Sequence, residues 1–556
     1  MGHTRIVIGL DFGTTYSGRI SVAWALGHCP DKPEVITSWP GQGNRTSPKV
    51  PSRVSYSDGK FLWGYQTTIF GENIRGLKIL LDESQDPRVV SALSTMDLLT
   101  KNRKTAIEVT GSYLKQLVEH SSKILHRRFG QIVNQMDRSY VLTVPAVWSD
   151  KAKHATMTAA VTAGIAANEI TLVSEPEAAA LYCLKAIQPN SIRNGDVVVV
   201  CDAGGGTVDL ISYCVKTVSP LRLEEVAEGS GGICGSMVLD VCFSEFLDDL
   251  IGKKNIPIMA KEMALRFWQE DIKLNFATDP DYEDEIHFVP VPGVKDNRQV
   301  SLKDGFLKLN GSQIKNLFDP VVQKVQNLIR GQIRSCEDSK KAVKAVFLVG
   351  GFGSSEYLFH RIKNVFTRIT VMQPPNSWSA VMLGAVQHGI EGNQVAKRIA
   401  RHHYGVTFRS RYGADLARYP PAIREWCDLE ERWYVPKVMA WYIKKGDEIA
   451  ENKPIRLPFN RSLADIDRSK LIFHDELLVC HKSESPRRRD ETVFEVCTLE
   501  SDLSAVPTYL FEAKTNSRGT KYYRVNYVLI MTPRSASITF ELEFNGTSYG
   551  LIQSKY

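Results

Sequence analysis

The chain has 556 residues, a length that corresponds to about two to four folded domains. Hydrophobic residues make up 43% of it and charged residues 24%, an ordinary globular composition that excludes collagen-like and wholly disordered proteins. The net charge is only +7 and the basic clusters are short, so we expect no dedicated nucleic-acid surface. No window approaches about 18 uncharged apolar residues, so we expect no membrane span and a cytoplasmic or nuclear location.

Two segments far apart in the chain share one pattern. Residues 6–25 and 197–215 each contain an apolar β-branched run, an Asp, a turn rich in Gly or Thr, and a second apolar run. This order is typical of a β-hairpin. The repeat predicts two similar lobes, over residues 1–195 and 196–395, each beginning with the same hairpin.

Strands and helices alternate through the rest of the first lobe. The sequence predicts a loop-rich stretch over 40–65, a helix over 105–128 from its hydrophobic spacing, and a strand over 140–144. Ser149 is an N-cap candidate for a helix through residue 167, and Pro176 suits the first turn of another helix. Alternation of this kind predicts an α/β fold with a largely parallel sheet in each lobe.

The second lobe continues the alternation. We expect helices near residues 237–250, 259–276 and 313–333, then a buried strand over 345–349. A Gly-rich loop follows this strand, and a helix begins at Ser355. The helical pattern ends near Gly389.

The residue pattern of the sequence changes near the end of the second lobe. Residues 392–401 are basic and have a helical pattern, after which alternating apolar and polar residues dominate, as in 523–529 and 538–544. Turn signals separate these runs. We therefore expect residues 396–556 to form a separate, mainly β domain.

The turns of the two hairpins have the composition of phosphate-binding loops. Glycines allow the backbone to approach an anion, successive N–H groups point into the turn, and a Thr hydroxyl adds a donor. Asp11 and Asp202 precede these turns, where a carboxylate could hold Mg²⁺ directly or through water. One such turn alone is more often structural, but two copies favour a nucleotide site. The competing G-x-x-x-x-G-K-[ST] phosphate motif does not occur.

Five segments, in order, resemble the seventy-kilodalton heat-shock chaperone family, within the actin and sugar-kinase superfamily of two-lobed ATPases. They are GLDFGTT (9–15), LTVPAVWSD (142–150), VSEPEAAAL (173–181), VCDAGGGTVDL (200–210) and LVGGFGSSEYL (348–358). The resemblance implies an actin-like fold with duplicated ribonuclease-H-like lobes, ATP and Mg²⁺ as ligands, and a β domain that binds unfolded or specific client protein segments. Co-chaperones are further implied partners.

The resemblance also assigns roles to individual residues. The metal candidates, acting through water, are Asp11 and Asp202, and the catalytic candidates are Lys78, Glu175, Asp202 and Thr207. The implied phosphate-binding residues are Gly13, Thr14, Thr15, Gly204, Gly205, Gly206, Thr207 and Asp209. The implied adenosine-binding residues are Gly350, Gly351, Gly353, Ser354, Glu270 and Lys273.

Several of these residues have simpler interpretations. Lys78 could be an exposed helix lysine, and Glu175 could be a carboxylate favoured by the dipole at a helix start. Glu270 and Lys273 could be solvated charges, because the pattern around them departs from that of the family.

Other departures concern how the family relays its nucleotide state. Lys153 stands where the family has an Arg, and an ammonium cannot reproduce the bidentate geometry of a guanidinium. Trp378 stands where the family has an acidic residue near the nucleotide. We find no acidic, leucine-rich linker, helical lid or acidic tail in the sequence. These differences resemble the divergent, lidless branch of the family, its member-twelve type.

The leading hypothesis is an ATP-binding, slowly ATP-hydrolysing, chaperone-like protein whose nucleotide state is coupled to the β domain. An alternative is a nucleotide-gated binding module with negligible turnover. A small-molecule kinase of the same superfamily is a third candidate, although no Asp base beside a sugar pocket can be named. Filament formation of the actin type is a fourth.

Overall fold

The computed structural model divides the chain into two compact units, residues 1–394 and 395–556, which are described separately. The structure describes residues 5–13, 19–26, 33–44, 46–57, 59–68, 71–82, 93–186, 192–277, 285–413, 419–450, 453–467 and 471–555. No helix within these ranges is both long enough and apolar enough to cross a membrane.

The first sheet of unit 1 begins with the hairpin expected at the N-terminus. Its strands are β1 (Arg5–Asp11), β2 (Arg19–Leu26), β3 (Glu34–Val35), β4 (Val50–Pro51), β7 (Asp137–Val144) and β8 (Ile170–Ser174). The order is β3-β2-β1-β7-β8, and β4 also pairs with β2. β1 runs antiparallel to β2 and parallel to β7, which runs parallel to β8. The apolar run of residues 6–10 is buried, because β1 lies inside the sheet.

The second sheet repeats this arrangement. Within unit 1 its strands are β9 (Val197–Ala203), β10 (Val208–Val218), β11 (Leu221–Gly232), β15 (Val343–Val349) and β16 (Thr370–Met372). Their order, β11-β10-β9-β15-β16, and their directions match β3-β2-β1-β7-β8 strand for strand. The predicted duplicated α/β fold is therefore confirmed.

The helices expected in unit 1 are present, and two further helices, over residues 93–101 and in the expected Gly-rich loop at 350–353, were not predicted. They are α1 (Leu93–Lys101), α2 (Ala106–Phe129), α3 (Asp150–Thr162), α4 (Glu175–Ala186), α5 (Ser236–Leu247), α6 (Ile258–Phe267), α7 (Lys273–Asn275), α9 (Gly311–Asp338), α10 (Gly350–Gly353), α11 (Glu356–Val365) and α12 (Ala380–Glu391). Thr105 and Glu108 form a capping box at the start of α2, and Ser149 caps α3. α3 ends at Thr162 rather than near residue 167, because Gly164 adopts φ +92°.

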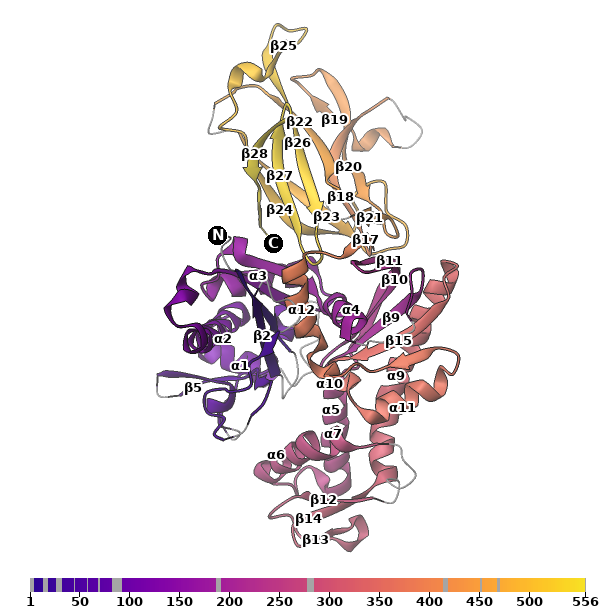
Figure 1. Cartoon of the computed structure of the whole chain (residues 1–556). Coiled ribbons are helices and arrows are strands. Elements are labelled where there is room, and N and C mark those ends of the chain that lie inside the picture. The colour runs from indigo at the N-terminus through magenta and orange to yellow at the C-terminus, as the bar shows by residue number, and fades with distance from the viewer. Residues whose placement is uncertain are drawn as a thin grey trace. The chain divides into compact units, whose positions relative to one another are not determined.

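Helices α4 and α12 pack together between the two sheets of unit 1 (Figure 1). Their backbones approach so closely that a Cβ on Gly384 would lie 1.7 Å from the Ala178 carbonyl oxygen. Gly9 in β1 makes a similar approach to α12, where a Cβ would lie 2.8 Å from Val386. Glycine is required at these positions because any side chain would push the helices apart.

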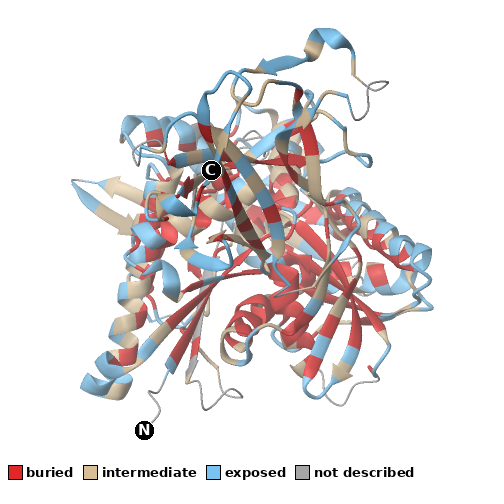
Figure 2. Cartoon of the chain, turned by 90° about the horizontal axis from the view of Figure 1, so that it is seen from above, coloured by how far each residue is buried: buried red, intermediate tan, exposed pale blue. Residues whose placement is uncertain are grey.

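Two small sheets lie outside the duplicated core. The expected loop-rich stretch 40–65 contains a hairpin, β5 (Val54–Ser57) with β6 (Lys60–Trp63), so that prediction was only partly correct. The second small sheet consists of β12 (Ile286–Pro290), β13 (Leu302–Lys303) and β14 (Phe306–Asn310). Figure 2 shows the buried residues concentrated along the central strands, while the outer helices alternate between buried and exposed positions.

Unit 2 is mainly β, as the alternating pattern predicted. Its strands are β17 (Val395–Ile399), β18 (His403–Arg411), β19 (Glu425–Cys427), β20 (Arg432–Ile443), β21 (Glu448–Ala450), β22 (Ile455–Leu463), β23 (Ile472–Cys480), β24 (Val493–Asp502), β25 (Glu512–Thr515), β26 (Lys521–Pro533), β27 (Ile538–Phe544), β28 (Thr547–Leu551) and β29 (Gln553–Lys555). One sheet has the order β19-β20-β18-β23-β24-β29, and another has the order β22-β26-β27-β28 with β25 beside β26.

The prediction of a helical segment over 392–401 was wrong. Gly392 adopts φ +75° and ends α12, and residues 395–399 form β17, which pairs antiparallel with β21. The basic residues in this segment gave it a helical pattern, but the pairing partner lies about 50 residues further along the chain. Local periodicity could not reveal that partner.

Candidate functional site

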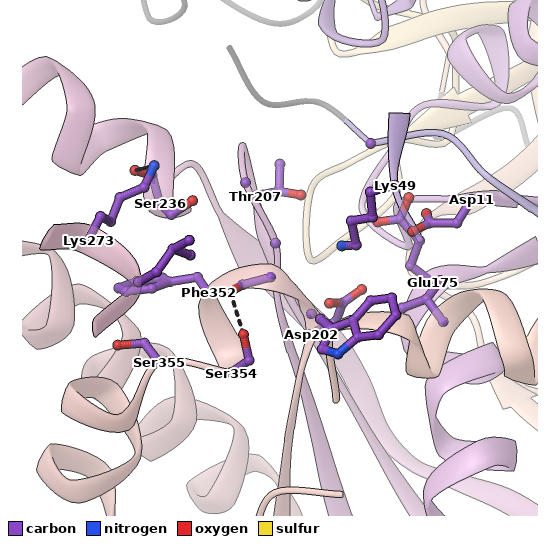
Figure 3. Close-up of a pocket in the computed structure, with 18 of the residues that line it drawn as sticks. Asp11, Lys49, Glu175, Asp202, Thr207, Ser236, Lys273, Phe352, Ser354 and Ser355 are labelled. Carbon is purple, nitrogen blue, oxygen red and sulfur yellow. Dashed lines mark hydrogen bonds between the residues drawn. The ribbon is translucent and has the colours of Figure 1, made fainter. Parts of the chain in front are cut away.

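A cavity of about 330 Å³ in unit 1 is lined by residues from both lobes. Twelve of the residues proposed from the sequence line it: Asp11, Gly13, Lys78, Glu175, Asp202, Gly204, Gly205, Thr207, Lys273, Gly350, Gly351 and Ser354. Figure 3 shows Asp11, Lys49 and Glu175 on one side of the cavity, Ser236 and Lys273 on the other, and Asp202 below Thr207 between them. The folding of two similar lobes therefore brings residues from six distant segments together.

The turn between β9 and β10 is held from behind by the start of α5. The carbonyls of Gly204, Gly205 and Gly206 accept hydrogen bonds from three successive backbone N–H groups, those of residues 236, 237 and 235 respectively. A Cβ on Gly235 would lie 2.4 Å from the Gly205 oxygen, so only glycine allows this approach. Because its carbonyls are directed toward α5, the turn presents Gly204, Gly205 and Thr207 to the cavity.

Three carboxylates line the base of the cavity, and a fourth, that of Asp209, lies close behind them. Glu175, Asp202 and Asp209 are buried, and Asp11 is half-buried. Burial raises the pKa of Glu175 to about 7, with Lys78 opposing the shift and Asp11 and Asp209 adding to it. Burial, and then the neighbouring carboxylates, also raise the pKa of Asp202 well above its usual value. The site therefore concentrates negative charge where little water can solvate it.

Lys78 is the buried cation of this cluster. Its side chain is 4% exposed and forms an ion pair and hydrogen bond with Glu175. Its ammonium also lies 5.7 Å from the centre of the Trp148 ring. The interpretation of Lys78 as an exposed helix lysine is therefore wrong, because its charge lies inside the site and is directed at Glu175.

The carboxylate cluster fits a hydrated divalent cation. The four acidic side chains outnumber the single ammonium of Lys78, so a bound cation would offset the excess negative charge. No group of three or more His, Cys, Asp or Glu side chains in the described ranges is placed to hold a metal directly. Mg²⁺ keeps several of its waters and uses one or two carboxylates, so Asp11 and Asp202 suit contact through water.

Hydrogen bonds hold the carboxylates at defined positions. Thr143 in β7 donates to Asp11 over 3.0 Å, and the backbone N–H of Val147 donates to Asp209 over 3.3 Å. Asp209 thus binds the neighbouring lobe's backbone and, like Gly206 and Gly353, does not line the cavity itself. Thr14 and Thr15 lie outside the described residues.

The opposite wall of the cavity is organised by Asp240 in α5, which the sequence did not suggest. Its carboxylate accepts hydrogen bonds from Trp268 (3.1 Å), Gln269 (3.0 Å) and Lys273 (2.7 Å). Gln269 and Lys273 then line the cavity. Because Lys273 is buried against Asp240, it is not a solvated charge.

Glu270, by contrast, does not line this cavity. It forms an exposed ion pair with Arg266 one helical turn away and lines a different depression, beside Met263 and Phe267. The adjacent residue, Gln269, faces the cavity instead. Adjacent residues on a helix point in different directions, and the loosely matching sequence could not fix that register.

The Gly-rich segment after β15 approaches the end of β9. Gly350 adopts φ +87°, and a Cβ there would lie 2.3 Å from an Asp202 carboxylate oxygen. Gly353 accepts a hydrogen bond from the Gln373 side chain over 2.7 Å, which holds the short helix α10 in place. Ser354 donates to the Gly351 carbonyl over 2.8 Å (Figure 3).

Sequence reasoning missed several lining residues. They are Ser47, Pro48, Lys49, Ser236, Gln269, Leu274, Phe352, Ser355 and Val381. Lys49 lies within the stretch predicted only as loop-rich, yet its side chain points into the cavity (Figure 3) and its ammonium lies 5.7 Å from the Trp378 ring centre. No local motif marks Lys49, because its position depends on the pairing of β4 with β2.

Two departures from the family pattern are also located. Trp378 lines the cavity and contacts Lys49, so an aromatic ring and a cation occupy a region where an acidic residue was expected. Lys153 lies in α3, with its ammonium 3.5 Å from the Asp150 carboxylate on the same helix. A single ammonium there provides one point charge rather than a bidentate fork.

Comparison with known proteins matches this architecture. The family profile described as Hsp70 protein covers residues 7–399, and a domain of unknown function (DUF8568) covers residues 398–553. The chain is 25% identical over 509 residues to "Heat shock 70 kDa protein 12A" of Mus musculus, covering 75% of this chain and 74% of that protein.

Two other proteins with heat-shock or chaperone names are similar over most of this chain. "Heat shock 70 kDa protein 12B" of Homo sapiens is 24% identical over 535 residues, covering 77% of this chain and 75% of that protein. "Chaperone protein DnaK 3" of a Synechococcus strain is 25% identical over 413 residues, covering 70% of this chain and 58% of that protein. The expected resemblance, including that to the member-twelve type, is confirmed. It indicates nucleotide binding and a chaperone-like role. The chain belongs to the Hsp70 family.

Proposed function

We propose that unit 1 binds ATP with Mg²⁺ in the cavity between its lobes and hydrolyses it slowly, and that the nucleotide state biases unit 2, which binds protein segments. The observation that carries this proposal is the buried Lys78–Glu175 pair, which lies among Asp11 and Asp202 in one cavity with the glycine-rich turns. Membership of the Hsp70 family supports the choice of nucleotide.

Hydrolysis of a phosphoanhydride depends on positioning and charge more than on covalent chemistry of the protein. The turn at Gly204–Thr207 would bind phosphate oxygens through its backbone, and the Lys78 ammonium would stabilise oxygens that gain charge. Glu175, when ionised, would orient the attacking water and accept its proton. A Mg²⁺ held through water by Asp11 and Asp202 would neutralise phosphate charge.

The raised pKa of Glu175 supports the proposal that hydrolysis is slow. With a pKa of about 7, a substantial fraction of this carboxyl group is protonated at neutral pH and cannot accept a proton from water. The Lys78 ammonium is also committed to the Glu175 pair. Both features favour binding over rapid turnover.

Coupling to unit 2 is supported by the connection between the units. Helix α12, which packs on α4 and β1, ends at Glu391, and β17 begins at Val395. Only three residues separate the two elements, too few for a flexible linker that would absorb a shift of α12. A closing motion of the lobes would therefore be transmitted to β17, the first strand of unit 2.

The test is a single-turnover ATPase measurement on the purified full chain. Asp202→Asn should lower the rate at least about 100-fold, because it removes a buried charge beside the phosphate turn. Asp97→Asn, an exposed carboxylate on α1, is the matched control and should leave the rate unchanged. An unchanged rate in the Asp202 variant would contradict the proposal.

The same measurement separates the alternatives. ATP binding without measurable turnover in the unaltered protein would replace hydrolysis with a nucleotide-gated binding module. Consumption of ATP only on addition of a sugar would instead support a small-molecule kinase.

A further inference from the structure

A second cavity, of about 450 Å³, lies in unit 2 against one face of the β18–β20 ladder. Its apolar lining includes the buried side chains of Val435, Val438 and Met439 on β20. Trp441 and the 45% exposed ring of Phe408 extend this apolar lining. An aromatic ring exposed to that extent beside a cavity is available to a ligand.

The segment 485–489 forms one wall and is fixed to β20. β20 bulges at Lys437, which adopts φ +58°, and there the backbone N–H of Arg489 donates to the Lys437 carbonyl over 2.9 Å. The N–H of Met439 donates to the Arg487 carbonyl over 2.9 Å, and the Trp441 indole donates to Pro486 over 2.8 Å. The wall is therefore held by backbone pairing and is preformed.

The three successive arginines of this segment have different contacts. Arg488 donates to the Pro436 carbonyl over 3.1 Å, and Arg489 forms an ion pair with Glu476. Arg487 lines the cavity, and its side chain forms no ion pair with any residue that the structure describes. Two of the arginines thus hold the wall in place, while the third presents its charge to the cavity.

The described lining of the cavity is positively charged. Arg411, Lys444 and Arg487 line it, and its described lining includes no Asp or Glu. Most of the net positive charge of the chain also lies in unit 2. Cations beside an apolar surface complement a ligand that has both carboxylates and an apolar group.

We propose that this cavity binds an acidic segment of a partner protein. Carboxylates of that segment contact Arg487 and Lys444, and one of its apolar side chains packs on Met439 and Trp441. This inference rests on the proposed function, because it names the class of protein segment that unit 2 recognises.

The surrounding structure favours recognition through side chains. β18 pairs with β20 from Tyr404 to Arg411 and with β23 only over His403–Gly405, and the edge of β20 facing the cavity wall is occupied by residues 487–489. An added β-strand therefore has no free edge on β20 at this wall. A single-stranded nucleic acid needs a groove that follows several phosphates, whereas these cations line a cavity that holds one or two side chains.

The experiment uses the full chain and three labelled peptides of about 12 residues. The peptides share their Leu and Phe positions and carry Glu, Gln or Lys at the others. The Glu peptide should bind about tenfold more tightly than the Gln peptide. The double variant Arg487→Gln with Lys444→Gln should lose about tenfold in affinity for it, while Lys453→Gln, an exposed lysine outside the cavity, should not.

Charge reversal provides the decisive comparison. Arg487→Glu with Lys444→Glu should invert the preference, so that the Lys peptide binds more tightly than the Glu peptide. A variant that had merely lost its fold could not produce this inversion. Binding of ATP, measured in the same samples, should be unchanged in every variant.

Three outcomes would overturn the proposal, and they are distinguishable. Equal, nucleotide-dependent binding of all three peptides would leave the proposed function intact and remove the acidic preference. Absence of binding by every peptide would contradict client binding by unit 2 as well. Binding of single-stranded RNA or of vesicles containing phosphatidylserine at Arg487, without binding of the Glu peptide, would exclude a protein partner.

Discussion

The cavity of unit 1 and the cavity of unit 2 use charge in opposite ways. In unit 1, three buried carboxylates and half-buried Asp11 lie around the buried ammonium of Lys78, and a second buried ammonium, that of Lys273, pairs with Asp240 on the opposite wall. In unit 2, the charges are exposed cations on an apolar floor. Buried charges interact strongly and shift one another's protonation, whereas exposed charges are screened by water and salt. We therefore propose chemistry at phosphate for the first cavity and recognition for the second.

This contrast predicts that substitutions in the first cavity have large effects that salt does not change. Substitutions in the second cavity should have smaller effects on binding that salt weakens. The first cavity also depends on close backbone packing, since Gly235, Gly350 and Gly384 each leave no room for a Cβ. The described walls of the second cavity depend on hydrogen bonds between β20 and 485–489.

The largest effect is expected for Gly384→Ala. The new Cβ would lie 1.7 Å from the Ala178 carbonyl oxygen, so α4 and α12 would have to separate. We expect a loss of at least about 3 kcal/mol in the free energy of unfolding of unit 1, measured by urea denaturation. The control Gly331→Ala has open space on α9 and should stabilise by about 0.5–1 kcal/mol. Equal stabilities would contradict the packing of unit 1.

Lys78→Ala should have the next largest effect, a fall of about 100-fold in single-turnover ATP hydrolysis. ATP affinity should change far less, because the phosphate turn is intact. The control Lys101→Ala removes an exposed lysine that pairs with Glu72 and should be neutral. If hydrolysis in Lys78→Ala equals that of the unaltered chain, the buried pair has no catalytic role.

Glu175 should make the stability of the nucleotide-free protein depend on pH. Its folded pKa of about 7 lies above its ordinary value of 4.5, so the folded state retains the proton longer. The stabilisation from this group is full below about pH 4.5 and is lost as pH rises to about 7. Thermal unfolding of Glu175→Gln should show a smaller decrease over this window. Parallel pH profiles for the two proteins would show that this carboxyl titrates normally.

Salt sharpens the comparison of the two cavities. Raising the ionic strength from about 0.05 to 0.5 M should weaken binding of the Glu peptide to unit 2 several-fold, because Arg487 and Lys444 are exposed. The pH window of Glu175 should move little, because that group is buried. Equal salt sensitivity would remove the distinction between the two sites.

The smallest effect is expected for Lys49→Ala. Its half-buried ammonium lies beside Trp378 in the first cavity, so its loss should weaken ATP binding about threefold by isothermal titration. Lys60→Ala, an exposed lysine on β6, should bind ATP normally. A loss shared by both variants would point to a general charge effect rather than a contact.

The repeated hairpins were predictable because each is encoded locally by an apolar run, an Asp and a glycine-rich turn. Asp240 and Gln269 were not predictable, since their roles depend on how α5 faces the residues after α6. β17 was misjudged for the same reason, because its partner β21 is distant in the chain.

The sequence by itself determined the duplicated lobes, the glycines that the turns require and the identity of the central carboxylates. Backbone conformation and residue chemistry are local properties, so motifs carry them. Only the tertiary structure decided that Lys78 is buried on Glu175, that Lys49 enters the same cavity and that Glu270 faces away from it. Burial, and the pKa shifts that follow from it, depend on which distant segments pack together, and no local pattern specifies that.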